Sequence, residues 1–180
     1  MENLGKAIFQ HYEKFLGEMI GADNNARWNF QLMGYQDPVH NCLTFATMGL
    51  SLHAEELGSC CEAVLTAEDE YDSCAWIFTQ VLSYLLEHQL PLSRGMAIGG
   101  IDQLDPEFYR NHGKSALYFT EATMFNPAFR EVDGRCRIYM AFFISPGEEV
   151  WLRKHGTEEF EKRLEEQKTD IIKLDRKSAC

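Results

Sequence analysis

The segment Cys136–Ile144 (CRIYMAFFI) is almost continuously apolar and constrains the fold more than any other stretch of the chain. A strand with apolar side chains on both faces has to be covered on both sides, so it belongs near the centre of a sheet. A helix predicted over Tyr71–Leu90 is apolar around most of its circumference, which indicates packing on more than one side. A central strand and a central long helix together predict a layered structure around a common core.

The hydrophobic pattern of the whole chain predicts elements in the order α-β-β-β-α-β-β-β-α-α. Besides the two segments above, the pattern predicts helices over 3–20, 146–155 and from 157 onward, strands over 28–32, 40–51, 57–66, 92–101 and 115–122, and a loop or short helix over 105–113. Because consecutive strands outnumber strand–helix alternations, the expected class is α+β. We expect a mixed, mostly antiparallel sheet packed against the central long helix, with N- and C-terminal helices. Thr157 is expected to cap the last helix, and the tail from about Thr169 is expected to fray.

Length and composition suit one globular domain over 1–180, since the chain has 180 residues of which 45% are hydrophobic. Residues 1–21 lack the basic start and apolar run of a signal peptide. No stretch approaches the ~20 apolar residues of a membrane span. We therefore expect a cytoplasmic protein without membrane contact. Its cysteines are expected to be reduced and mostly buried as small hydrophobic residues: Cys42, Cys60, Cys61, Cys74, Cys136 and Cys180.

Charge is distributed unevenly along the chain, whose formal net charge is -11. Between Arg27 and Arg94 there is no lysine or arginine, although nine carboxylates lie in that window. Such a field repels phosphate backbones, which excludes nucleic acid as the expected partner, and it attracts basic proteins. Much of the window is predicted core, so the charge is expected to concentrate on six residues: Glu55, Glu56, Glu68, Asp69, Glu70 and Asp72. These six are the candidate partner-binding residues; the alternative is a solvated surface that keeps the protein soluble.

The cysteines leave two chemical alternatives open. Cys60 and Cys61, with Cys74 and a histidine such as His53, suggest either a zinc site or a nucleophile. Structural zinc prefers cysteine pairs separated by two to four residues, whereas adjacent cysteines in a strand point to opposite faces, so one of the two is expected to face the core. A nucleophilic thiol has to be accessible and within reach of a histidine, and the order of residues alone shows neither.

Two further segments resemble ligand sites only superficially. Glu68–Asp72 is acidic but lacks the glycine and closing glutamate of a calcium-binding loop. Arg94–Gly100 is rich in glycine but lacks the lysine and hydroxyl residue of a phosphate-binding loop. The sequence therefore predicts no cofactor and no metal.

Four segments stand in a characteristic order: Thr44–Ser51 (TFATMGLS) followed by Glu56-Leu57, the apolar helix around Trp76–Leu86, Gly95, and Phe142–Gly156 (FFISPGEEVWLRKHG) followed by Phe160 and Leu164. Together they cover about residues 28–164 and resemble the suppressor of fused domain family, in its compact bacterial type. The first predicted helix lies outside this resemblance.

The resemblance implies a protein-binding domain without catalytic activity. Larger animal members of the family clamp a short extended peptide between two subdomains, and this chain resembles only the first of them. Bacterial members resemble immunity proteins, so the leading hypothesis is neutralisation of a toxin by an acidic face that binds a basic toxin domain. The alternatives are an enzyme that uses Cys60 or Cys61 as its nucleophile, and a scaffold that binds a short peptide at an exposed sheet edge. The oligomeric state stays open.

Overall fold

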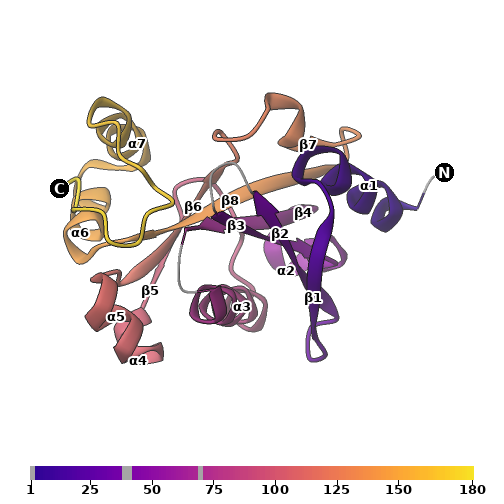
Figure 1. The fold of residues 1–180 in the computed structure, drawn as a ribbon, viewed down its shortest axis with the longest axis horizontal. Coiled ribbons are helices and arrows are strands. Elements are labelled where there is room, and N and C mark those ends of the chain that lie inside the picture. The colour runs from indigo at the N-terminus through magenta and orange to yellow at the C-terminus, as the bar shows by residue number, and fades with distance from the viewer. Residues whose placement is uncertain (1–2, 38–41, 69–70) are drawn as a thin grey trace.

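The structure is a computed structural model that describes residues 3–37, 42–68 and 71–180 (Figure 1). Within these ranges the strands are β1 (Met19–Asn25), β2 (Phe30–Asp37), β3 (Cys42–Met48), β4 (Cys61–Ala67), β5 (Ala97–Gly99), β6 (Ala116–Glu121), β7 (Glu131–Val132) and β8 (Cys136–Ile144). The α-helices are α1 (Leu4–Leu16), α2 (Ala54–Leu57), α3 (Tyr71–Glu87), α4 (Ile101–Leu104), α5 (Pro106–His112), α6 (Pro146–His155) and α7 (Thr157–Glu166). The 3₁₀ helices are η1 (Leu50–His53) and η2 (Pro127–Phe129).

The strands form one sheet in the order β1-β2-β3-β4-β8-β6-β5, and β7 pairs with β8 outside this path. β4 and β8 are parallel, while the other described pairs are antiparallel. The predicted α+β class with a mostly antiparallel sheet is therefore confirmed. β8 lies between β4 and β6, which confirms the central position predicted from its apolar sequence.

Each face of the sheet carries its own hydrophobic core. One core lies under α3, α4 and α5, and the other under α1, α6 and α7. In Figure 1, α3 lies below the sheet, with α1 and α7 above it. Successive residues from Ile138 to Phe143 of β8 belong to the two cores in turn, because neighbouring side chains in a strand point to opposite faces. This alternation explains why nearly all of β8 has to be apolar.

The N-terminal third differs from the prediction. α1 ends at Leu16 and not near Ile20, because Gly17 adopts a φ of 88° that stops the helix. Met19, expected on the helix, begins β1, whose mostly exposed polar residues give no alternating pattern. Trp28 lies in the turn before β2, which starts at Phe30.

Three further elements are shorter than predicted. The strand expected over 40–51 is β3, followed by a turn at Gly49 with a φ of 111°; its first predicted residues, 40 and 41, lie outside the described residues. The strand expected over 57–66 begins at Cys61, because Leu57 ends α2. The strand expected over 92–101 is reduced to β5.

α3 is the long helix expected after Tyr71, but it is not packed on all sides. The side chains of Trp76 and Tyr84 are 45% and 46% exposed. The opposite side of the helix packs on the sheet with residues that are at most 4% exposed: Cys74, Ile77, Phe78, Val81, Leu82, Leu85 and Leu86. α3 therefore covers one face of the sheet and presents its other side to solvent.

The C-terminal part contains two corrections. Gly156, and not Thr157, is the N-cap of α7. The tail from Thr169 is packed and not frayed, since Leu174 and Ala179 are 4% and 3% exposed. Tail packing depends on contacts with distant residues, which local sequence does not reveal.

Candidate functional site

The outer side of α3 carries two exposed aromatic residues. Trp76 and Tyr84 are eight positions apart and therefore about 80° apart around the helix axis, so both face solvent on the side opposite the sheet. The Tyr84 ring contacts the His88 ring at a centroid distance of 4.2 Å. Exposed aromatic side chains on one helix face are typical anchors of protein interfaces.

Three of the candidate acidic residues, Glu55, Glu56 and Glu68, have described side chains, and they lie at the two ends of α3. Glu55 and Glu56 are on α2, which packs near the C-terminal end of α3, where the Leu92 amide donates to the Leu57 carbonyl at 3.0 Å. Glu68 follows β4 and precedes the start of α3, with one carboxylate oxygen 4.0 Å from the Lys173 ammonium. The helix has 17 residues and is therefore about 25 Å long.

The six residues thus do not form one continuous acidic cluster among the described parts of the chain. Asp69 and Glu70 lie outside the described residues, and Asp72 is the second residue of α3. The structure places Glu55 and Glu56 beside one helix end and Glu68 beside the other, with the two aromatic residues between them. We call this surface, made of the outer side of α3 with Glu55, Glu56 and Glu68 at its ends, the α3 face.

Glu62, one of the nine carboxylates of the window, is not a surface charge at all. Its side chain is fully buried, and its carboxylate accepts hydrogen bonds from Thr47 Oγ1 at 2.6 Å and from the backbone amides of Gly49, Leu50 and Ser51 at 2.9, 3.3 and 3.2 Å. Burial raises the pKa of Glu62, although these hydrogen bonds partly offset the effect. The sequence signal for this buried role is that Glu62 is a single glutamate inside an apolar strand. A count of charges along the chain does not distinguish it from the exposed acids.

Five of the six cysteines divide between the two cores: Cys61 and Cys74 belong to one, while Cys136 belongs to the other, with Cys60 and Cys180 packed against it. Cys61 is completely buried under α3, and burial raises the pKa of its thiol to about 12, so Cys61 is not suited to act as a nucleophile. His53, the suggested partner, places Nε2 2.6 Å from the Trp28 carbonyl and Nδ1 3.8 Å from Glu56. Within the described ranges, no group of three or more His, Cys, Asp or Glu side chains is arranged to hold a metal ion.

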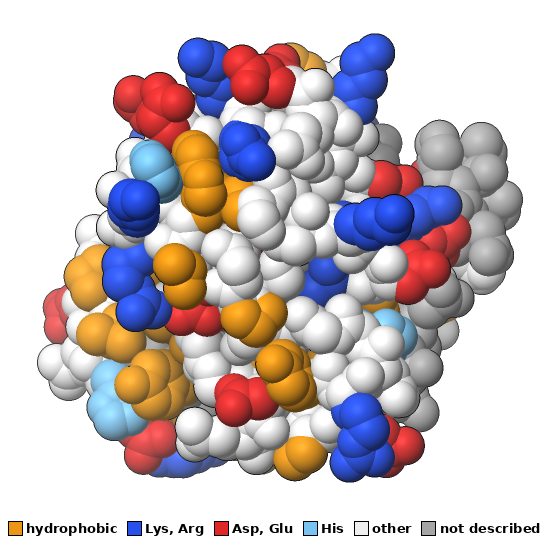
Figure 2. Space-filling model, turned by 90° about the vertical axis from the view of Figure 1, so that its left-hand side faces the viewer, with side chains coloured by type: hydrophobic (Ala, Val, Ile, Leu, Met, Phe, Trp, Pro, Cys, Tyr) orange, Lys and Arg blue, Asp and Glu red, His pale blue; other side chains and the backbone are white. Residues whose placement is uncertain are grey.

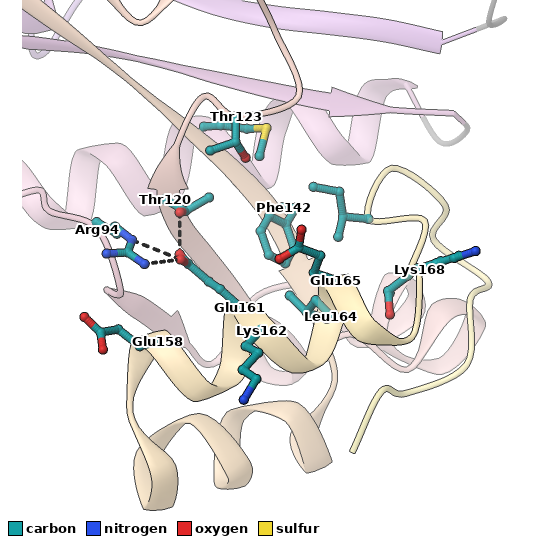
Figure 3. Close-up of a pocket in the computed structure, with 13 residues that line it drawn as sticks. Arg94, Thr120, Thr123, Phe142, Glu158, Glu161, Lys162, Leu164, Glu165 and Lys168 are labelled. Carbon is teal, nitrogen blue, oxygen red and sulfur yellow. Dashed lines mark hydrogen bonds and ion pairs between the residues drawn. The ribbon is translucent and has the colours of Figure 1, made fainter. Parts of the chain in front are cut away.

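A groove of about 690 Å³ lies between α7 and the sheet (Figure 3). Met140, Phe142, Leu164 and Ile171 supply apolar lining, and the charged lining residues are Arg94, Glu158, Glu161, Lys162, Glu165 and Lys168. Because three cations alternate with three carboxylates, the groove does not select a ligand by the sign of its charge.

Glu161 on α7 is the centre of the polar contacts in this groove. Its carboxylate accepts hydrogen bonds from Tyr118 at 2.8 Å, from Thr120 at 2.5 Å and from Arg94 Nε at 2.9 Å. Burial alone would raise the pKa of Glu161, but the hydrogen bonds from Arg94, Thr120 and Tyr118 outweigh it and lower the pKa. Through Tyr118 and Thr120, this network joins α7 to β6.

Lysine and arginine side chains lie beside carboxylates at both surfaces. Figure 2 shows the side of the molecule formed by α4 to α7, where Lys and Arg side chains are interspersed with Asp and Glu. On the α3 face, the helix itself has no lysine or arginine, but cations from other segments lie beside it: Arg27 is paired with Glu87 at 2.9 Å, Lys173 lies 4.0 Å from Glu68, and Arg153 lines the same pocket as Tyr84.

An exposed sheet edge is also present. β1 is the outermost strand at one end of the sheet, and most of its residues are exposed, including Ile20 at 53%. At the other end, β5 is outermost but has only three residues. None of the helices in the described ranges is long and apolar enough to cross a membrane.

The fold defines an α+β domain built on one mostly antiparallel sheet. The family model for suppressor of fused protein (SUFU) matches residues 28–177. The chain therefore belongs to the suppressor of fused family, which confirms the resemblance found in the four sequence segments.

Solved structures support the same fold. A suppressor of fused homolog from Neisseria gonorrhoeae is similar to this chain with a TM-score of 0.79 and 14% sequence identity, covering 98% of this chain and 96% of its own. A chain of a Sufu–Fu complex is similar with a TM-score of 0.68 and 13% identity, covering 98% of this chain and 90% of its own. No curated protein sequence matches the chain.

Proposed function

We propose that this chain is a non-enzymatic protein-binding domain whose α3 face binds a basic protein. The observation that carries the proposal is the exposure of Trp76 and Tyr84 between two acidic helix ends. Family membership and the structural similarity to a Sufu–Fu complex support a protein partner. In its most specific form, the proposal is an immunity protein that acts in the cytoplasm and neutralises a toxin domain by covering its functional surface.

The two components of the α3 face have different physical roles. Tryptophan and tyrosine contribute much of the binding energy of protein interfaces when a partner buries them. Carboxylates at the rim attract a basic partner and mainly accelerate association. With a length of about 25 Å and a width of about 10 Å, one side of α3 presents roughly 250 Å², so the roughly 800 Å² that each partner contributes to a standard interface has to include the neighbouring surface as well.

The partner is to be identified by affinity capture from native cells with the wild-type chain and with a Trp76→Ala/Tyr84→Ala variant as parallel baits. Each protein retained by the wild-type bait is then purified, whether or not the variant retains it, and its binding to both baits is measured kinetically. We expect the aromatic variant to bind it about 100-fold or more weakly, mostly through faster dissociation, because two interface anchors are removed.

The electrostatic part is tested by changing Glu55, Glu56, Glu68 and Asp72 to Ser. Association should slow about tenfold at low ionic strength, and its dependence on salt should flatten. The matched control changes Glu158, Glu159, Glu165 and Glu166 on α7 to Ser, which alters the net charge equally at a different surface. A partner whose binding ignores both the aromatic and the acidic variants, or responds equally to the α7 control, would overturn the proposal.

A second candidate is capture of a short extended peptide at the β1 edge, which the exposure of that strand favours. A peptide can add a strand there through backbone hydrogen bonds. The two candidates separate when the identified partner is shortened to linear peptides, because binding at a sheet edge survives this change and binding of a folded basic surface does not.

A further inference from the structure

Cys60 and Cys136 face each other across the two central strands. β4 and β8 are parallel, with Cys61 opposite Arg137, and the Arg137 amide donates to the Cys60 carbonyl at 3.1 Å. One residue earlier in both strands, Cys60 therefore stands opposite Cys136. Neighbouring strands are separated by about 4.8 Å, which falls within the range of Cα separations that disulfides span.

Both side chains lie on the same face of the sheet. Cys136 belongs to the core under α1, and Cys60 packs against that core. Cys61 instead belongs to the core under α3, as the alternation of side chains along a strand requires. Of the two adjacent cysteines, Cys60 is thus the one directed toward Cys136.

The two thiols differ in their access to solvent. Cys60 is partly exposed, whereas Cys136 is fully buried. Burial, followed by the nearby charge of Glu62, raises the pKa of the Cys136 thiol. Cys60 is therefore the thiol that a small disulfide reaches first, and the raised pKa of Cys136 makes its attack on the Cys60 sulfur the slow step.

We propose that Cys60 and Cys136 form a reversible cross-strand disulfide by exchange with a small-molecule disulfide such as oxidised glutathione. The Cys60 thiolate attacks one sulfur of the small disulfide, forming a mixed disulfide and releasing one small thiol. Cys136 then gives up its proton and attacks the Cys60 sulfur, which releases the second small thiol. Two protein thiols are oxidised to one disulfide, and one small disulfide is reduced to two thiols.

The bond would join strands that are adjacent in the sheet but far apart in the chain. It closes a loop of about 75 residues, and a long closed loop restricts the unfolded chain strongly. The oxidised protein should therefore unfold at a temperature roughly 10 °C higher than the reduced protein. This inference does not depend on the proposed partner.

The test incubates the full chain in glutathione buffers from fully reduced to fully oxidised, followed by acid quenching, alkylation and mass spectrometry of proteolytic fragments. We expect a fragment that links Cys60 to Cys136, with the loss of two hydrogen atoms, and its disappearance when a thiol reductant is added. The thermal midpoint should rise in parallel with the linked fragment.

Cys60→Ser is the informative variant, because Cys60 is partly exposed and the substitution is compatible with folding. In this variant the linked fragment and the thermal shift should both be lost, while the control Cys180→Ser should retain both. Oxidised buffers that leave Cys60 and Cys136 unlinked, or that link Cys60 to another cysteine, would overturn the proposal. A mixed disulfide between Cys60 and glutathione that persists, because Cys136 does not displace the glutathione, would overturn the proposal as well.

Discussion

At the scale of single residues, Glu62 has the least expected role in this chain. Its carboxylate binds the backbone amides of the turn after β3, in the segment TMGLS that contributed to the family resemblance. The motif is therefore explained by structure: Gly49 permits the turn at a φ of 111°, and Glu62 receives the amides that the turn exposes. A buried acceptor of this kind fixes the connection between β3 and η1.

Glu62→Gln should destabilise the protein by about 1–3 kcal/mol, because the amide group replaces one acceptor oxygen and leaves a buried donor without its partner. The free energy of unfolding in urea measures the effect. Glu55→Gln is the matched control, since Glu55 is exposed, and it should change stability by no more than about 0.5 kcal/mol. Equal effects of the two substitutions would contradict the structural role of Glu62.

Gly95 shows how one residue determines the approach of two elements. Its φ is 90°, and a Cβ at this position would lie 2.0 Å from Thr157 Oγ1 at the start of α7. Only glycine accommodates both the positive φ and this contact. The glycine that contributed to the family resemblance is therefore required for packing of α7 against the chain before β5.

At the scale of elements, the C-terminal tail is held by a buried ion pair with α6. Arg176 Nη1 lies 2.5 Å from Glu148 Oε1, and the two side chains are 5% and 0% exposed. Glu148 also accepts from the amides of Ser145 and Ala179 at 2.8 and 3.0 Å. One glutamate thus completes the capping box of α6 and fixes the tail beside it.

Arg176→Gln should lower the free energy of unfolding by about 3–5 kcal/mol, because it leaves the buried Glu148 charge without its partner. Hydrogen exchange should accelerate in residues 170–180 before the sheet opens. The control is Lys177→Gln at an exposed neighbouring position. If exchange in the tail were the same in both variants, the ion pair would not be what holds the tail.

At the scale of the whole molecule, the dependence of stability on pH comes from carboxylates whose pKa values are shifted in the folded chain, some downward and one upward. Glu148 and Glu161 have lowered pKa values; burial opposes this, but Arg176 on Glu148 and Arg94 on Glu161 outweigh it. The folded chain therefore binds these protons less tightly than the unfolded chain, whose carboxyl pKa is near 4.5. Their contribution is complete above that pH and is lost as the pH falls through the folded pKa values.

We expect the free energy of unfolding to decrease as the pH is lowered below about 4.5. Glu62 acts in the opposite direction, because its pKa is raised. Replacing Glu161 by Gln should reduce the slope of stability against pH in this range. Urea unfolding at a series of pH values measures that slope, and an unchanged slope would show that Glu161 does not titrate as inferred.

Much of the fold follows from local patterns. The apolar run of β8 predicted its central position, and Pro146 with Gly156 predicted the bounds of α6. By contrast, β1 has no alternating pattern, so the sequence did not predict this strand. The predicted end of α1 near Ile20 was also wrong, because the helix stops where Gly17 adopts a positive φ. The candidate acids were recognisable as charges, but the separation of Glu55 and Glu56 from Glu68 by the length of α3 was not, because it depends on how β4 and α3 pack.

The sequence by itself determined the class of fold, the family and the uneven distribution of charge, because each follows from residue type and order along the chain. Only the tertiary structure decided that Glu62 is buried, that Trp76 and Tyr84 are exposed between two acidic ends, and that Cys60 stands opposite Cys136. These properties depend on contacts between residues that are distant in the chain. Sheet register and helix packing create such contacts, and neither is contained in a local pattern.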